Sequence, residues 1–307
     1  MIFWRWPGAK SHLRIDALSR SDSVGKGFRA LVLSCLDQIR LNRIGVRRQG
    51  GAAVHDMRIG LRRLKTVLSL LKPFLIPEDL RRLRGEIGWL LAALGPARDI
   101  DAFLHDLEKL PTGKRPEVVH ALNLLRSDLR NIRGRLFREA GNAVKSRRFA
   151  QFVQALAGLQ PAQKRVRTGE RLLPFARHWL KKHHREILDR LAGLDRLDAN
   201  ERHELRIAIK KLRYGLEFFS LLFERRARER FIRLLQTLQN CLGQLNDMKI
   251  HRGIMDDVLR RTRPDHRVPE AFAIGFIEGV QEIRSRHYMK ATAQVGRKLS
   301  RLRVPWR

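Results

Sequence analysis

The sequence repeats itself once, at an offset of 148 residues and without a gap. A histidine, the cations that follow it and the apolar residues between them all have a counterpart in the second copy. The first block comprises His55, Arg58, Ile59, Leu61, Arg62, Arg63, Leu64 and Lys65, and the second comprises His203, Arg206, Ile207, Ile209, Lys210, Lys211, Leu212 and Arg213. Solenoid repeats have only about 20–50 residues, so this long unit predicts two equivalent halves that face each other across a pseudo-two-fold axis.

The register holds beyond the first block, because a Leu-Gly pair and an aspartate also return. Leu90, Leu94, Gly95 and Asp99 correspond to Leu238, Leu242, Gly243 and Asp247. We therefore place an N-terminal tail at 1–20 and one domain at 21–302, whose halves occupy about 21–160 and 169–302.

Apolar residues recur at steps of three and four almost throughout, and the alternation typical of strands is missing, so we expect an all-α fold of two pseudo-symmetric helical bundles. The expected helices of the first half are 22–45, 52–73, 77–95, 98–110, 116–140 and 146–158, and those of the second are 170–193, 200–224, 226–243, 247–262 and 269–302. Gly95-Pro96 is predicted to end one helix because proline carries no backbone N–H.

The charge balance points to an anionic partner. The chain has 64 Lys and Arg against 31 Asp and Glu, a formal net charge of +33, while 43% hydrophobic residues leave enough apolar surface for a folded core. A globular protein carries so much repulsion more easily when a polyanion neutralises it.

Other classes of protein are disfavoured. Cys35 and Cys241 are isolated, without the Cys or His neighbours of a zinc site, so we expect buried free thiols, no metal site and no cofactor. No uncharged apolar stretch of about 18 residues and no secretory leader is visible, so we expect a cytoplasmic protein without a membrane partner. The oligomeric state is left open.

On a helix at about 100° per residue, the first block separates into two faces. His55, Arg58, Arg62 and Lys65 share one side, and Leu64, Val67, Leu68 and Leu71 share the other; the second copy repeats this with His203, Arg206, Lys210 and Arg213 against Leu212, Leu216 and Phe219. Like charges one turn apart cost a few tenths of a kcal/mol each. The cations of residues 58–65 have no acidic neighbour except Asp56. Because two copies carry like charges at matched positions, an anionic ligand is favoured over a merely solvated face.

These residues resemble the CHAD domain, the conserved histidine α-helical domain. The matching strings are VHDMRIGLRRLK (54–65) and LGPARDID (94–101) in the first half, and HELRIAIKKLRY (203–214) and LQNCLGQLND (238–247) in the second. The resemblance covers about residues 20–295 and implies two helical bundles around a basic central channel that bind inorganic polyphosphate, often at polyphosphate granules. Gly60 and Gly215 depart from the family pattern, which has an alanine-like residue there.

The residues themselves are compatible with that ligand. Polyphosphate offers dense charge but no bases, so it requires Arg and Lys without aromatic platforms, and only 7% of this chain is aromatic. We expect binding without catalysis. A nucleic-acid binder and a His-dependent phosphotransfer or hydrolytic enzyme remain the alternatives.

The expected ligand contacts are His55, Arg58, Arg62, Arg63, Lys65, His203, Arg206, Lys210, Lys211 and Arg213, with secondary contacts from Arg81, Arg82 and Arg98. Arg84, Arg230 and Arg233 extend this secondary group. His55 and His203 could donate to phosphate, orient a neighbouring side chain, or take part in metal or covalent chemistry. Asp99 and Asp247 are expected to be structural: they would stabilise the start of a helix through its dipole, or hold a stripe arginine in place.

Overall fold

The computed structural model describes residues 22–113, 115–159 and 171–306. The expected tail at 1–20 and the expected boundary at 160–169 lie outside these residues. The described part contains nine α-helices: α1 (Val24–Arg47), α2 (Gly51–Leu70), α3 (Pro77–Leu107), α4 (Pro116–Lys145), α5 (Arg147–Ala157), α6 (Leu172–Ala192), α7 (Ala199–Phe218), α8 (Arg225–Arg261) and α9 (Arg267–Arg301). The all-α prediction is confirmed.

Two predicted helix breaks are wrong. Helix α3 continues through Gly95-Pro96, and α8 continues through the segment between Gly243 and Asp247. Pro96 removes the backbone bond to the carbonyl four residues earlier and crowds that carbonyl, whereas Leu94 and Ala97 on either side of it are fully buried. Tertiary packing of these apolar residues therefore outweighs the local breaking signal.

The two halves are related by the register of the sequence repeat. Helices α2 and α7 begin 148 residues apart, as do α3 and α8. Counterparts also meet each other: Ser23 forms an isolated β-bridge with Arg171, and the rings of Phe103 and His251 stack at a centroid distance of 4.4 Å. A residue contacts its own counterpart only at a symmetry axis, so these pairs mark the pseudo-two-fold axis.

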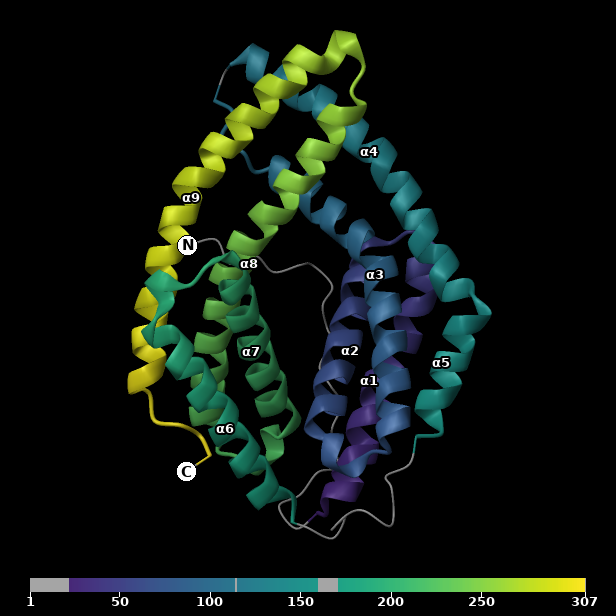
Figure 1. Cartoon of the computed structure of the whole chain (residues 1–307), viewed down its shortest axis with the longest axis vertical. Coiled ribbons are helices and arrows are strands. Elements are labelled where there is room, and N and C mark those ends of the chain that lie inside the picture. Colours follow the sequence, from purple (N-terminus) through teal and green to yellow (C-terminus); the bar gives the residue numbers. More distant parts are fainter. Residues whose placement is uncertain (1–21, 114, 160–170, 307) are drawn as a thin grey trace.

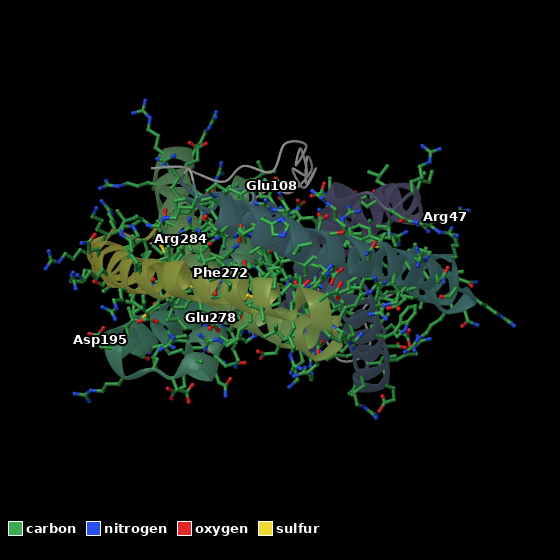
Figure 2. The ribbon with its side chains drawn as sticks, turned by 90° about the horizontal axis from the view of Figure 1, so that it is seen from above. Arg47, Glu108, Asp195, Phe272, Glu278 and Arg284 are labelled. Atoms are coloured by element: carbon green, nitrogen blue, oxygen red, sulfur yellow. The ribbon has the colours of Figure 1, made fainter. Side chains whose placement is uncertain are left out.

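The figures show how the halves are arranged. In Figure 1, α2 and α7 run side by side in the middle, with α1, α3 and α5 beyond α2 and α6 beyond α7. The long helices α3, α4, α8 and α9 extend upward into an arch. Seen from above in Figure 2, the counterparts Arg47 and Asp195 lie at opposite ends of the molecule, as a two-fold relation requires.

One hydrophobic core runs through the lower bundles of both halves, and a second, smaller core joins α3, α4, α8 and α9 in the arch. Cys35 and Cys241 are free and buried, as expected. Gly215 departs from the family pattern for a steric reason, because a Cβ at this position would overlap the Trp179 ring. Within the described helices, no segment is both long and apolar enough to cross a membrane.

Candidate functional site

The apolar faces of α2 and α7 decide where their cations point. Leu64, Val67 and Leu68 are completely buried on α2, and Leu212 and Leu216 are completely buried on α7. Each helix is thereby held in its own bundle by its apolar side, and α2 packs directly against α7. From these cationic sides, Arg58 and Arg62 of α2 act electrostatically on Arg206 and Lys210 of α7, whereas Lys65 and His203 are exposed.

Each half seats one arginine over a glycine. Arg58 Nη1 donates to the Leu91 carbonyl at 2.8 Å, and a Cβ on Gly95 would lie only 3.1 Å from that nitrogen. In the second half, a Cβ on Gly243 would lie 3.6 Å from Arg206 Nε. The Leu-Gly pair of the repeat therefore does not end a helix. It provides the place where a guanidinium packs against the helix.

The two aspartates lie beside these arginines in mid-helix, so the helix-dipole interpretation of Asp99 and Asp247 is wrong. Arg206 Nη2 lies 3.9 Å from Asp247 Oδ1. Burial raises the pKa of Asp99, with Arg58 opposing that rise and Asp247 adding to it. These contacts fit the alternative role, in which each carboxylate holds an arginine.

Five cations gather around this centre, and we call them the central cation cluster: Arg58, Arg62, Arg98, Arg206 and Lys210. Burial lowers the pKa of Arg58 to about 10, and Arg62 adds to that effect. Burial also holds the pKa of Lys210 well below its usual range, with further contributions from Arg62 and Arg206. Among the described residues, no carboxylate lies within ion-pair distance of Arg62 or Lys210. The cluster thus concentrates positive charge that Asp99 and Asp247 only partly balance.

The two histidines form hydrogen bonds at equivalent positions, but the His55 ring accepts in its bond whereas the His203 ring donates in its bond. Arg98 Nε donates to His55 Nδ1 at 3.0 Å, while His203 Nδ1 lies 2.7 Å from Oδ1 of Asn246, the counterpart of Arg98. Burial, together with the nearby charge of Arg98, lowers the pKa of His55 to about 4, so this ring is neutral near pH 7. An amide oxygen only accepts, so His203 Nδ1 is the donor in its pair. Of the three roles considered for the histidines, orientation of a neighbouring side chain is the one that these contacts fit.

Other expected contact residues lie away from the cluster or already have partners. Arg63 and Arg213 converge on Glu217; Arg63 Nη2 is 3.4 Å from Oε2, and Arg213 Nε also donates to Gln239 Oε1 at 2.9 Å. The Lys211 ammonium lies over the Trp179 ring of α6, 5.8 Å from its centroid. The Arg63–Glu217 pair therefore joins α2 to α7, and Lys211 faces its own bundle.

Lys65 is exposed, as are all the secondary cations except Arg98. Arg81 pairs with Glu78 at 2.8 Å and Arg82 pairs with Asp79 at 2.9 Å, both within the first turns of α3. Arg84, Arg230 and Arg233 are also on the surface. Of the secondary contacts, only Arg98 joins the central cation cluster.

Comparison with known protein families is decisive at this point, because residues 30–256 match the CHAD domain. The chain belongs to the CHAD domain family. A similar solved structure is the CHAD domain from the plant Ricinus communis, which is 25% identical, with a TM-score of 0.78 over 94% of this chain and 96% of that one. PptA from Streptomyces chartreusis is 18% identical, with a TM-score of 0.67 over 90% of this chain and 100% of that one, and shows the same fold. Curated proteins gave no match.

Sequence reasoning missed two side chains that this CHAD domain uses to build its centre. Asn246 partners His203, and Glu217 holds Arg63 and Arg213. The repeat contained a signal for Asn246, since an offset of 148 residues makes it the counterpart of Arg98. Nothing comparable pointed to Glu217, whose counterpart is Ser69.

Proposed function

We propose that this protein binds inorganic polyphosphate at the central cation cluster and does not turn it over. The observation that carries the proposal is the convergence of Arg58, Arg62 and Arg98 from one half with Arg206 and Lys210 from the other. One linear ligand placed there would contact both halves at once. The family resemblance implies the same class of ligand.

The chemistry of the cluster suits a chain of phosphates. Guanidinium groups donate in a planar fork to phosphate oxygens, and a lysine ammonium adds a mobile point charge. The aromatic pair nearest the axis, Phe103 and His251, is buried and stacked on itself. Single-stranded nucleic acid is usually held by exposed aromatic rings as well as by cations, so the local composition favours polyphosphate.

The energetics point the same way. Arg62 and Arg206 both act on Lys210 against its charged form, which means that the free protein bears like-charge repulsion in a poorly solvated place. An anionic ligand would remove that repulsion on binding. Relief of this repulsion is therefore expected to contribute to the free energy of ligand binding.

The test uses two neutral double variants of the full-length protein. Arg62→Gln with Lys210→Gln removes two cluster charges, and Arg81→Gln with Arg82→Gln removes two paired surface charges as the control. Affinity for long-chain polyphosphate should fall at least tenfold in the first variant, whereas its thermal stability should be unchanged or higher because repulsion is relieved. Unchanged affinity in the first variant, or an equal loss in the control, would contradict the proposal.

Two further measurements separate polyphosphate binding from the alternatives. Long-chain polyphosphate should displace the protein from DNA or RNA at equal phosphate concentration, and the reverse result would favour a nucleic-acid binder. Incubation with polyphosphate and a divalent metal should release no orthophosphate and leave no phosphohistidine. A protein that holds long chains should also sediment with isolated polyphosphate granules, and the double cluster variant should not.

A further inference from the structure

We propose that Asp128, His266 and Glu270 form a binding site for a first-row divalent cation such as Zn²⁺ or Mn²⁺ at the top of the arch. One ligand atom from each of these residues lies within 4.8 Å of the other two. Asp128 comes from the middle of α4, His266 from the turn before α9, and Glu270 from the first turn of α9. A cation bound there would link the first half to the second, far along the chain from the central cation cluster.

Glu270 is the residue that most needs a ligand. It is completely buried, and its Oε1 receives no hydrogen bond among the described residues. The Thr262 hydroxyl contacts the other oxygen, Oε2, and lies 2.8 Å from the Val258 carbonyl. A buried carboxylate whose charge is not compensated strongly destabilises the folded state. The free oxygen therefore requires either a proton or a cation.

The surroundings sharpen that choice. The second core, which includes Leu125, Leu129 and Ala273, lies on the same two helices. The Glu270 carboxyl also lies within hydrogen-bond reach of the Asp128 carboxyl. Two carboxylates alone could share one proton, but His266 adds a nitrogen ligand to the pair. A set of one imidazole and two carboxylates is suited to Zn²⁺ or Mn²⁺ better than to Mg²⁺ or Ca²⁺, which prefer oxygen ligands only.

The repeat supplies no second, symmetry-related copy of this site. The counterparts of His266 and Glu270 are Val118 and Leu122, and the counterpart of Asp128 is Phe276. All three counterpart positions are apolar, as is usual for a core between packed helices. The cluster is therefore a local departure from the repeat: three side chains that can bind a metal stand where the counterpart positions are apolar.

Metal binding can be measured directly on the full-length protein, after EDTA treatment and dialysis into a buffer free of phosphate and polyphosphate. Calorimetric titration with Zn²⁺, Mn²⁺ or Co²⁺ should show one saturable ion per chain, and bound Co²⁺ should give a visible absorption band. A saturating ion should raise the melting temperature by roughly 5 °C.

Glu270→Gln keeps the size of the side chain and its contact with Thr262, so it should fold, as should His266→Gln. Both variants should lose the saturable ion and the cobalt band. The matched control is His105→Gln, because His105 lies on the same arch, with Nδ1 3.5 Å from Glu108 Oε2, and does not belong to the cluster of Asp128, His266 and Glu270. Retained binding in Glu270→Gln, or equal loss in the control, would overturn the site. A wild-type protein indifferent to all three metals and stabilised by Glu270→Gln would also overturn it, and would show that Asp128 and Glu270 share a proton.

Discussion

The two halves of the molecule have nearly the same backbone plan but different side chains around the axis. Each half places an arginine over a glycine beside an aspartate: Arg58, Gly95 and Asp99 in the first, and Arg206, Gly243 and Asp247 in the second. Next to these shared groups, the first half has Arg98 and Phe103 where the second has Asn246 and His251. The arginine, glycine and aspartate that both halves share hold a cation at the centre. The residues that differ determine how much positive charge each half contributes there.

This comparison shows that each glycine leaves room for the guanidinium of the arginine packed against it. A Cβ at Gly95 would lie only 3.1 Å from Arg58 Nη1 and would crowd the guanidinium, so these two positions are coupled although they are 37 positions apart in the sequence. The second half can replace Arg98 by Asn246 without losing the hydrogen bond to its histidine, because the amide accepts where the guanidinium donates. The framework is thus symmetric, and the electrostatic field around it is not.

The largest expected effect concerns the shared frame. Leu64→Glu and its counterpart Leu212→Glu each place an unpaired charge at a completely buried position, which should cost several kcal/mol of unfolding free energy. Because one core runs through both lower bundles, either variant should unfold the whole chain in a single transition on urea denaturation followed by circular dichroism. Two separate transitions would show that the halves are independent.

Acid should weaken the fold through histidines that differ between the halves. Burial lowers the pKa of His55 and of His251 to about 4, from an ordinary 6.5. The unfolded chain therefore binds protons at these sites first, and stability that is complete above pH 6.5 is lost as the pH falls toward 4, by about 3 kcal/mol per histidine.

Denaturation midpoints between pH 7 and 4 measure this loss. His251→Phe, which copies the residue of the first half, and His55→Gln, whose amide can still accept from Arg98, should each flatten the curve. His203→Gln, at the exposed counterpart, is the control. An unchanged slope in both test variants would remove these histidines from the acid response.

Substitution by alanine should affect Gly95 and Gly243 unequally. An alanine Cβ at Gly95 would lie 3.1 Å from Arg58 Nη1, whereas at Gly243 the nearest guanidinium atom is 3.6 Å away, an ordinary contact. Gly95→Ala should weaken polyphosphate binding by roughly three- to tenfold, on the order of 1 kcal/mol, and Gly243→Ala should have little effect. Equal losses in calorimetric titrations would contradict the proposed difference between the two seats.

The smallest expected effect comes from making the halves more alike. Asn246→Arg gives the second half the cation that the first has in Arg98, next to the exposed His203. One additional phosphate contact should strengthen binding about two- to threefold at low salt, with the gain disappearing at high salt. A weaker affinity at low salt would argue that the cluster already has all the charge it can use.

Much of this architecture could be predicted from the sequence, and the errors have identifiable causes. The three- and four-residue spacing around Leu64 and Leu212 predicted which face of each helix is buried, because burial of apolar area dominates helix packing. The offset of 148 residues predicted the axis on which Phe103 meets His251. The break at Gly95-Pro96 was wrong, since a local signal cannot show how strongly Leu94 and Ala97 are packed by distant residues.

The site could be predicted only in part. Arg58 and Arg62 act electrostatically on Arg206 and Lys210, as a shared side of each helix would lead one to expect; their binding of a ligand stays a prediction. Arg63 and Arg213 were expected to bind ligand as well, but Glu217 lies between them. A partner contributed by another helix is invisible to a periodicity argument, which describes one helix at a time.

The salt dependence of polyphosphate affinity tests the central claim most directly, because each contact between a cation and a phosphate releases a bound counterion. The logarithm of the association constant should fall steeply and linearly with the logarithm of salt concentration for the wild-type protein. In Arg62→Gln with Lys210→Gln, the slope should be smaller by about one to two, whereas Arg81→Gln with Arg82→Gln should leave it unchanged. A flat dependence in the wild-type protein, or the same slope in all three proteins, would contradict binding at the central cation cluster.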